Sequence, residues 1–157
     1  MAALVAFTAE SFATASPVPF GAALVHTATG SLLVQARNAV MPENDPSAHA
    51  ELRAVRLACS RLGQPSLAGY TLYSTCEPCP MCMANALWAG VERLVYGATI
   101  ADASRHCRQI FIPAAEVIRR SDMECALTPE VSRELCVALF HHPAMLAAFA
   151  TWSTRKA

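Results

Sequence analysis

Residues 70–97, YTLYSTCEPCPMCMANALWAGVERLVYG, decide the fold of this chain. Tyr70–Ser74 predicts a buried strand, Cys79-Pro80 is typical of a helix start, and Val91–Gly97 predicts a second strand. The helix between the two strands is expected to end at about Ala89. A strand–helix–strand order indicates that the two strands pair in parallel, with the helix as the crossover.

The residues before this unit predict a first helix and a hairpin. Met1–Thr14 is apolar enough for a helix that packs on the core. Phe20–Thr27 and Ser31–Gln35 predict antiparallel strands, and Thr29-Gly30 between them is typical of a tight turn.

A second helix is expected from Asp45-Pro46, with Asp45 as its N-cap, to Gly63. Its apolar residues recur at spacings of three and four, which predicts a stripe that faces the core. The residues of this stripe are Ala48, Leu52, Val55, Cys59 and Leu62.

The signals weaken beyond Ala101. Ile110–Ile112 suggests a short edge element, Thr128–Phe140 a helix capped by Thr128, and Pro143–Trp152 a last helix. The predicted class is therefore α/β, a mixed sheet flanked by helices, and 157 residues fit a single domain over residues 1–157.

The composition limits the partners of the chain. Its formal net charge is zero and it shows no basic stripe, which argues against a nucleic-acid partner. Hydrophobic residues make up 54% and charged residues only 15%, a weak indication of a homo-oligomer.

The cysteine pattern and the N-terminus indicate the compartment. Three of the seven cysteines lie close together, which favours metal chemistry in a reducing compartment over a disulfide framework. Ala13-Thr14-Ala15 imitates a signal-peptidase site, but Glu10 interrupts the apolar segment and no positive region precedes it. No stretch reaches the roughly 18 apolar residues of a membrane span. We expect a cytoplasmic protein without a membrane segment.

Two short segments carry the residues for chemistry. His49 and the pair Cys79 and Cys82 are good zinc ligands, and the C-x-x-C spacing lets both sulfurs reach one tetrahedral ion. Three protein ligands leave a fourth position for water, as in catalytic zinc sites. Glu51, beside His49, is the expected catalytic residue, because it could take a proton from that water and pass it to the substrate.

A structural zinc site is the alternative without catalysis. Such a site needs a fourth protein ligand, and Cys76 in the run Cys76-x-x-Cys79-x-x-Cys82 could supply it. The position of Glu51 next to the ligand His49 favours the catalytic interpretation.

These residues resemble the signature H-x-E…P-C-x-x-C of the cytidine deaminase superfamily. The chain is most similar to the branch with bacterial guanine deaminases, tRNA adenosine deaminases and yeast-type cytosine deaminases. The similarity covers roughly residues 18–100, on Pro19–Ala22, Asn38, Asn44–Glu51 and Ser74–Cys82. It implies a three-layer α-β-α fold with a mixed five-stranded sheet, Zn²⁺, a homodimer, and replacement of an amino group on a ring carbon by oxygen.

The same resemblance implies a set of substrate-binding residues. Asn38 would contact the base, and the backbones of Ala48 and Glu77 would lie beside the ring. Phe20 would line the pocket or belong to the core. Trp88 falls where guanine deaminases carry a tryptophan that helps to close the pocket, and Ala147–Trp152 resembles their C-terminal helix.

These features favour guanine or a guanine-like purine or triazine as a free base. A tRNA wobble-adenosine deaminase, or a cytosine or nucleoside deaminase, is the enzymatic alternative. One stretch departs from guanine deaminases, which are acidic where this chain carries Arg105 and Arg108. The two arginines either belong to the pocket, where they would favour an acceptor-rich or anionic substrate edge, or are solvated surface.

Overall fold

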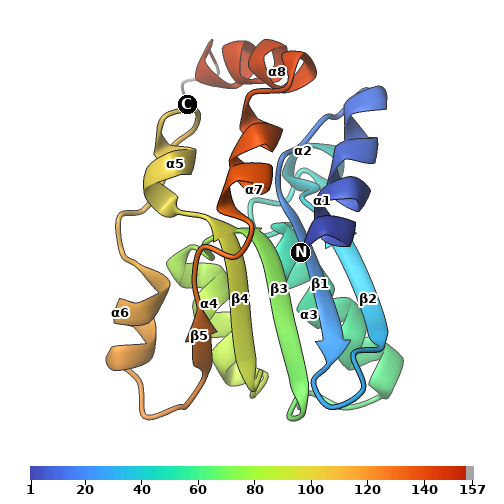
Figure 1. The fold of residues 1–157 in the computed structure, drawn as a ribbon, viewed down its shortest axis with the longest axis vertical. Helices are drawn as coiled ribbons and strands as arrows, with labels where there is room; N and C mark the ends of the chain where they lie inside the picture. Colours follow the sequence, from blue (N-terminus) through green and yellow to red (C-terminus); the bar gives the residue numbers. More distant parts are fainter. Residues whose placement is uncertain (155–157) are drawn as a thin grey trace.

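The computed structural model describes residues 1–154, which form a mixed sheet between two layers of helices (Figure 1). The sheet has the order β2-β1-β3-β4-β5. Its strands are β1 (Gly21–His26), β2 (Leu32–Arg37), β3 (Tyr70–Cys76), β4 (Arg93–Ala98) and β5 (Ala126–Thr128). Strand β1 pairs antiparallel with β2 and β3, whereas β3–β4 and β4–β5 are parallel pairs. The predicted α/β class, the mixed five-stranded sheet and the parallel crossover are confirmed.

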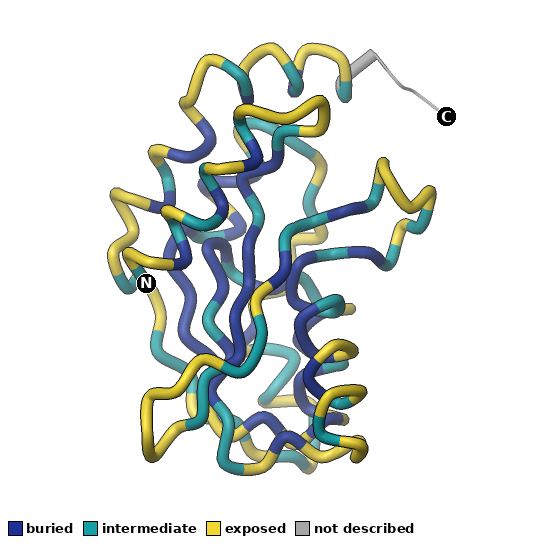
Figure 2. The backbone as a smooth tube through the Cα atoms, turned by 90° about the vertical axis from the view of Figure 1, so that its right-hand side faces the viewer, coloured by how far each residue is buried: buried dark blue, intermediate teal, exposed yellow. Residues whose placement is uncertain are grey.

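The helices cover both faces of this sheet. They are α1 (Ala2–Ala9), the 3₁₀ turn η1 (Glu10–Ala13), α2 (Val40–Glu43), α3 (Ala50–Leu62), α4 (Pro80–Trp88), α5 (Ile100–Ser104), α6 (Ala114–Arg119), α7 (Arg133–Phe140) and α8 (Pro143–Thr154). Helices α3 and α4 lie behind the sheet in the view of Figure 1, and α1 and α7 lie in front of it. The central strands β1, β3 and β4 are largely buried, whereas the edge strands β2 and β5 and the outer turns of the helices are more exposed (Figure 2).

Two apolar clusters fill the space between the layers. The larger one joins the sheet to α3 and α4 and includes Leu24, Leu72 and Leu94. The smaller one lies under α7 and α8 and includes Phe140 and Phe149. No single helix among the described residues is long and apolar enough to span a membrane. Helix α7 and the start of α8 together have the length and apolar composition of a span, but they are bent by 59° at the break between them.

The start of the second predicted helix was wrong. Helix α3 begins at Ala50, with His49 as its N-cap, and not at Asp45. The Asp45 carboxylate instead accepts from the backbone N–H and the hydroxyl of Ser47 and forms a local turn. The end of the helix at Gly63 is confirmed by its φ of 67°, a left-handed conformation that suits glycine.

The buried face of α3 also differs from the predicted stripe. Its buried residues are Ala50, Glu51, Ala54, Val55 and Ala58, while Leu52, Cys59 and Leu62 are half-buried. Small side chains therefore let α3 lie close to the sheet. Because this face includes Glu51, the helix carries a carboxylate into the interior.

Two predictions for the C-terminal half were wrong. Ile110–Ile112 forms no strand, and the fifth strand of the sheet is Ala126–Thr128. Helix α7 begins at Arg133 and not at Thr128, which belongs to β5. Glu130 and Ser132 have positive φ angles of 58° and 54°, so the backbone turns here before the helix starts. The last helix, from Pro143, is confirmed.

Helix α7 lies directly on β4. A Cβ atom added to Gly97 would collide with the side chain of Cys136. Glycine is therefore required at this point of β4 for close packing. The contact brings the C-terminal half of the chain to the end of the sheet where β3 meets α4.

Candidate metal centre and active site

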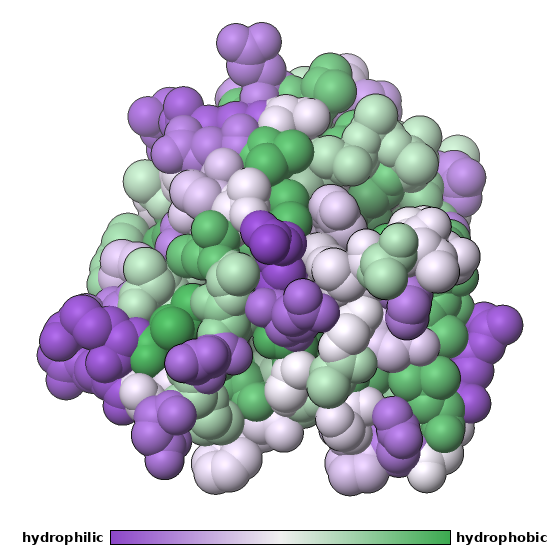
Figure 3. Space-filling view, turned by 60° about the horizontal axis from the view of Figure 1, so that its bottom comes forward, coloured by the Kyte–Doolittle hydropathy of each residue, from purple (hydrophilic) through white to green (hydrophobic). Residues whose placement is uncertain are grey.

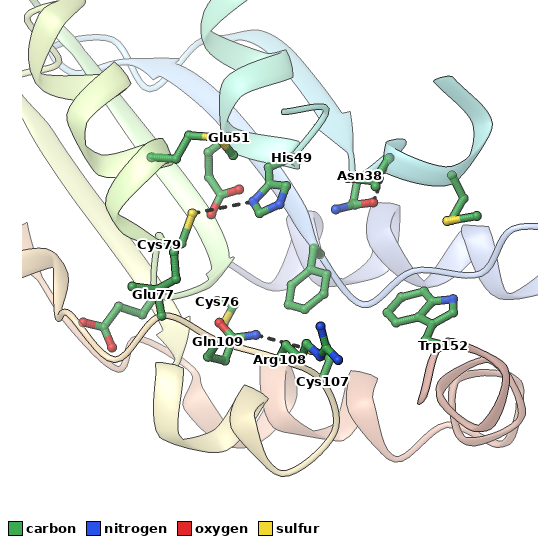
Figure 4. Close-up of a pocket in the computed structure, with 15 residues that line it drawn as sticks. Asn38, His49, Glu51, Cys76, Glu77, Cys79, Cys107, Arg108, Gln109 and Trp152 are labelled. Carbon is green, nitrogen blue, oxygen red and sulfur yellow. Dashed lines mark hydrogen bonds between the residues drawn. The ribbon is translucent and has the colours of Figure 1, made fainter. Parts of the chain in front are cut away.

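Three potential zinc ligands meet at the N-termini of two helices. His49 is the N-cap of α3, Cys79 is the N-cap of α4, and Cys82 lies in the first turn of α4. The Cys79 sulfur lies 3.7 Å from His49 Nδ1 and 3.6 Å from the Cys82 sulfur. The Cys82 sulfur lies 3.5 Å from His49 Nδ1. The structure thus brings together the three residues that the sequence predicted. Figure 4 shows two of them, His49 and Cys79, facing each other.

This donor set fits a zinc ion. Tetrahedral zinc with its usual bond lengths to sulfur and imidazole nitrogen places the ligand atoms about 3.5–3.8 Å apart. The three measured separations of 3.5, 3.6 and 3.7 Å fall in this interval. One imidazole and two sulfurs are also the ligand types that zinc prefers.

The protonation of the two sulfurs is uneven. The hydrogen bond between the two sulfurs, together with His49, lowers the pKa of Cys79 to about 4. The same hydrogen bond and burial raise the pKa of Cys82. Cys79 therefore loses its proton more readily than Cys82, and the thiolate is the form in which cysteine binds metal.

Glu51 lies directly behind the ligands. Its side chain is buried at 7% exposure, because α3 turns this residue towards the sheet. One carboxylate oxygen accepts from the Ser74 hydroxyl at 3.2 Å, and the other lies 3.6 Å from the Cys82 sulfur. Burial raises the pKa of this carboxyl group. A carboxyl group with a raised pKa beside a metal site is suited to accept and return a proton.

Cys76 does not join the three ligands. Its sulfur points to the backbone carbonyl of Thr99 at 3.7 Å, and burial raises the pKa of its thiol. Within residues 1–154, the cluster of metal-binding side chains contains His49, Cys79 and Cys82 alone. The described residues therefore offer three ligands, as a catalytic site requires.

His49, Cys79 and Glu51 line a cavity of about 610 Å³. Two parts of the chain line it. The first part supplies Phe20, Asn38, Val40, Met41, His49, Glu51, Cys76, Glu77, Cys79 and Met81. The second part supplies Cys107, Arg108, Gln109, Ile110 and Trp152. A cavity of this size, with reactive polar groups at one end, is typical of a small-molecule site.

Residues 1–98 match the family described as the cytidine and deoxycytidylate deaminase zinc-binding region. The chain belongs to this family. The match includes all three zinc ligands and Glu51, and it ends with β4.

Two curated relatives are similar to this member of the deaminase family. The guanine deaminase of Bacillus subtilis is 43% identical over 86 residues, which are 55% of this chain and 54% of the relative. A tRNA-specific adenosine deaminase of Agrobacterium fabrum is 46% identical over 81 residues, 52% of each chain. The chain thus spans about half the length of the curated relatives that it matches.

The similarity of the folds extends further along the chain. A solved structure of guanine deaminase from Nitrosomonas europaea has a TM-score of 0.76 and covers 96% of this chain and 82% of its own. The two chains are 24% identical, so the comparison shows the shared fold. The deaminase fold therefore includes the C-terminal helices, where the sequence signals are weak.

Three predicted substrate-binding residues lie at the cavity. Asn38 follows β2, and its side-chain oxygen accepts from the Val40 N–H at 3.1 Å, which leaves its NH₂ group for a ligand. Phe20 lies between the cavity and Phe140, with ring centroids 5.6 Å apart. Glu77 also lines the cavity, but its carboxylate accepts from two backbone N–H groups, as described below.

Two other predicted substrate-binding residues lie outside the cavity. Trp88, at the end of α4, is 79% exposed and is not part of the lining. Ala48 is fully buried, its N–H donates to the Asp45 carbonyl, and its own carbonyl accepts from Ala39. Both assignments therefore stay predictions. Trp152 of α8 supplies the tryptophan that does line the cavity.

The sequence did not reveal the role of the Glu77 side chain. One of its oxygens accepts from the Ile100 N–H at 3.1 Å and the other from the Ala114 N–H at 3.0 Å. The carboxylate therefore holds the first turns of α5 and α6 against the loop that precedes Cys79. No sequence motif marks this contact, because its acceptor and donors lie 23 and 37 residues apart.

Proposed function

We propose that the chain is a zinc-dependent hydrolytic deaminase of a free nucleobase or a related amino-heterocycle. The observation that carries this proposal is the buried Glu51 carboxyl group beside three zinc ligands at the end of a cavity. In the reaction, water supplies the oxygen that replaces the amino group on a ring carbon, the C–N bond breaks, and ammonia leaves.

His49, Cys79 and Cys82 would hold the metal. The chemistry that zinc supplies at such a site is Lewis acidity, which makes water acidic enough to attack near neutral pH. Glu51 would accept a proton from the attacking water and deliver it to a ring nitrogen of the substrate. A second transfer through Glu51 would carry the remaining proton of the same water to the amino group, which departs as ammonia. The Ser74 hydroxyl, 3.2 Å away, holds the carboxylate in place for both transfers.

Guanine or a guanine-like purine or triazine is the favoured substrate class. The 43% identity to the Bacillus subtilis guanine deaminase supports this choice. The position of Trp152 at the cavity supports it further, because the C-terminal helix of guanine deaminases, which the last helix resembles, packs over an active site. Asn38 would contact the base through its NH₂ group, with the Phe20 ring and the Glu77 backbone beside the ring.

A tRNA wobble-adenosine deaminase is the second candidate. The 46% identity to the Agrobacterium fabrum tRNA-specific enzyme favours it. The net charge of zero argues against a tRNA substrate, because proteins that bind nucleic acid usually carry a basic surface. On the face seen in Figure 3, hydrophilic side chains form separate groups among hydrophobic ones and no continuous stripe for a polynucleotide.

An ammonia-release screen tests the proposed function. Zinc-loaded and zinc-free protein are incubated with guanine, cytosine, adenine, isoguanine, pterin, ammeline and the corresponding nucleosides. We expect release from a purine-like free base by the zinc-loaded protein alone. Inosine formation in an added tRNA, with no release from small molecules, would replace the first candidate by the second.

We also propose a homodimer in the cytoplasm. Large apolar side chains are exposed at Trp88, at 79%, and at Ile110 and Phe111, at 58% and 73%, which supports burial against a second copy. All seven cysteines are free, which suits a reducing compartment. Light scattering is expected to give twice the chain mass of 16.8 kDa, and a monomer mass would contradict the dimer.

A further inference from the structure

The wall of the cavity opposite the metal ligands carries a positive charge. Arg108, in the loop between α5 and α6, belongs to the cavity lining, whereas Arg105 does not. Figure 4 shows the Arg108 side chain on the same side of the cavity as Cys107 and Trp152, away from His49 and Glu51. The two arginines of this loop therefore have different surroundings, and only one of them can meet a ligand in the cavity.

This positive charge is not neutralised by the protein. Among the described residues, the Arg108 guanidinium makes no ion pair and no hydrogen bond. The carboxylates that line the cavity are Glu51 and Glu77. Glu51 is buried beside the zinc ligands, and Glu77 uses both oxygens on the backbone N–H groups of other segments. Neither carboxylate pairs with Arg108, so its guanidinium is available to a ligand in the cavity.

A second donor faces the same space. The Asn38 oxygen accepts from the Val40 N–H, and this bond fixes the orientation of the amide. The NH₂ end is therefore the part of Asn38 that is free for a ligand. The cavity offers an amide donor and a guanidinium to a substrate whose reacting carbon lies at the metal. Such a lining is complementary to an acceptor-rich edge that bears negative charge.

We propose that the substrate is an amino-heterocycle with an anionic group, a carboxylate or a phosphate, on the edge remote from the reacting amino group. This inference rests on the proposed deaminase function and replaces a neutral free base by an anionic amino-heterocycle as its substrate. Arg108 pairs with the anionic group, because a guanidinium offers two parallel N–H donors to a carboxylate or a phosphate. The cavity of about 610 Å³ has room for a ring system and such a substituent.

Matched pairs of substrates test the proposal. Pterin and pterin-6-carboxylate differ by a carboxylate, and cytidine and cytidine monophosphate differ by a phosphate. Ammonia release is measured for both pairs with the zinc-loaded wild type, Arg108→Met and Arg108→Lys. Arg105→Met is the matched control, since it removes the same charge from the same loop outside the cavity. Binding of the two pterins is measured separately by their fluorescence, on zinc-loaded Glu51→Gln protein with and without Arg108→Met.

The anionic member of at least one pair is expected to be preferred. Arg108→Met should lower its kcat/KM and its affinity about tenfold or more, the size of one charge-assisted hydrogen bond. The neutral member should change less than about twofold, Arg108→Lys should recover part of the loss, and Arg105→Met should resemble the wild type. The pair that responds identifies a carboxylate or a phosphate as the recognised group.

The experiment distinguishes a failure of the anion-recognition proposal from a failure of the proposed deaminase function. Ammonia release from neutral substrates with no preference for either anionic partner would overturn the role of Arg108 and leave the deaminase function intact. The same conclusion follows if Arg108→Met and Arg105→Met weaken pterin-6-carboxylate binding equally. Absence of release from every substrate, although anionic ligands bind through Arg108, would overturn the deaminase function and leave the recognition of the anion in place.

Discussion

Residues 1–98 and residues 99–154 contribute to one cavity by different means. The first region supplies the zinc ligands from helix N-termini and Glu51 from a buried helix face, so each group is fixed by regular structure. The second region supplies Arg108 from an exposed loop and Trp152 from the last helix. In the proposed function, the groups for the reaction come from the first region alone, while the second region adds substrate contacts from a loop and the last helix, where changes of sequence are tolerated more readily.

Loss of a zinc ligand is expected to have the largest effect. Cys79→Ser should lower the bound zinc at least about tenfold at equal free zinc and abolish turnover, because a hydroxyl is a far weaker ligand than a thiolate. Bound zinc is measured by elemental analysis after dialysis.

Cys76→Ser is the matched control for this experiment. It should retain zinc, since the Cys76 sulfur points to the Thr99 carbonyl. Equal loss of zinc from both variants would make Cys76 a fourth ligand and favour a structural zinc site.

The second largest effect is expected from Glu51→Gln. Turnover should fall about 10²- to 10⁴-fold, the usual contribution of a general acid–base group, because an amide cannot carry the proton. Zinc content should stay equal to that of the wild type, which distinguishes a catalytic role from a role in metal binding. A variant that keeps both zinc and turnover would contradict the proposed mechanism.

A smaller effect is expected in the second region, at the pair of Asp102 and Arg133. The Asp102 carboxylate accepts from Arg133 Nε and Nη2 at 2.8 Å and also caps α5 through Thr99. Asp102→Asn should lower the free energy of unfolding by about 1–3 kcal/mol. The loss is expected at the lower end of this range, because Arg133 is 44% exposed and solvent screens the pair. Denaturant titration at pH 7 measures this difference.

The effect of Asp102→Asn should depend on pH. The Arg133 hydrogen bonds hold the pKa of Asp102 well below its usual range. The stabilisation is therefore present in full above the unfolded-state pKa of about 3.9 and is lost as the pH falls towards the lower folded-state pKa. The difference between wild type and variant should shrink from pH 5 to pH 3. A constant difference would show that the charge of Asp102 does not matter.

The sequence predicted the first region well, because its signals are local. Cys79-Pro80 marks a helix start by its own chemistry, and the ligand spacing depends on one helical turn. Asp45 misled the prediction of α3, since an aspartate before proline can either cap a helix or close a turn with Ser47. His49 and Glu51 were nevertheless identified correctly as neighbours of the two cysteines, as their distances show.

The second region was predicted less well, because its structure depends on distant contacts. Strand β5 has three residues and gains its ladder only beside β4. The sequence around Arg105 and Arg108 does not indicate which of them lines the cavity, because this depends on the backbone conformation of the loop. Trp88 was selected by resemblance, yet its position on the outer face of α4 leaves it exposed.

The Glu77 carboxylate has a consequence for redesign. By accepting from the N–H groups of Ile100 and Ala114, it fastens both ends of the intervening segment to the residue that precedes the metal-binding turn. The residues between Ile100 and Ala114 can therefore be replaced while both ends of the segment stay in position and the zinc ligands are unchanged. A library confined to residues 105–112 would thus vary the lining of the cavity while leaving the three zinc ligands and Glu51 unchanged.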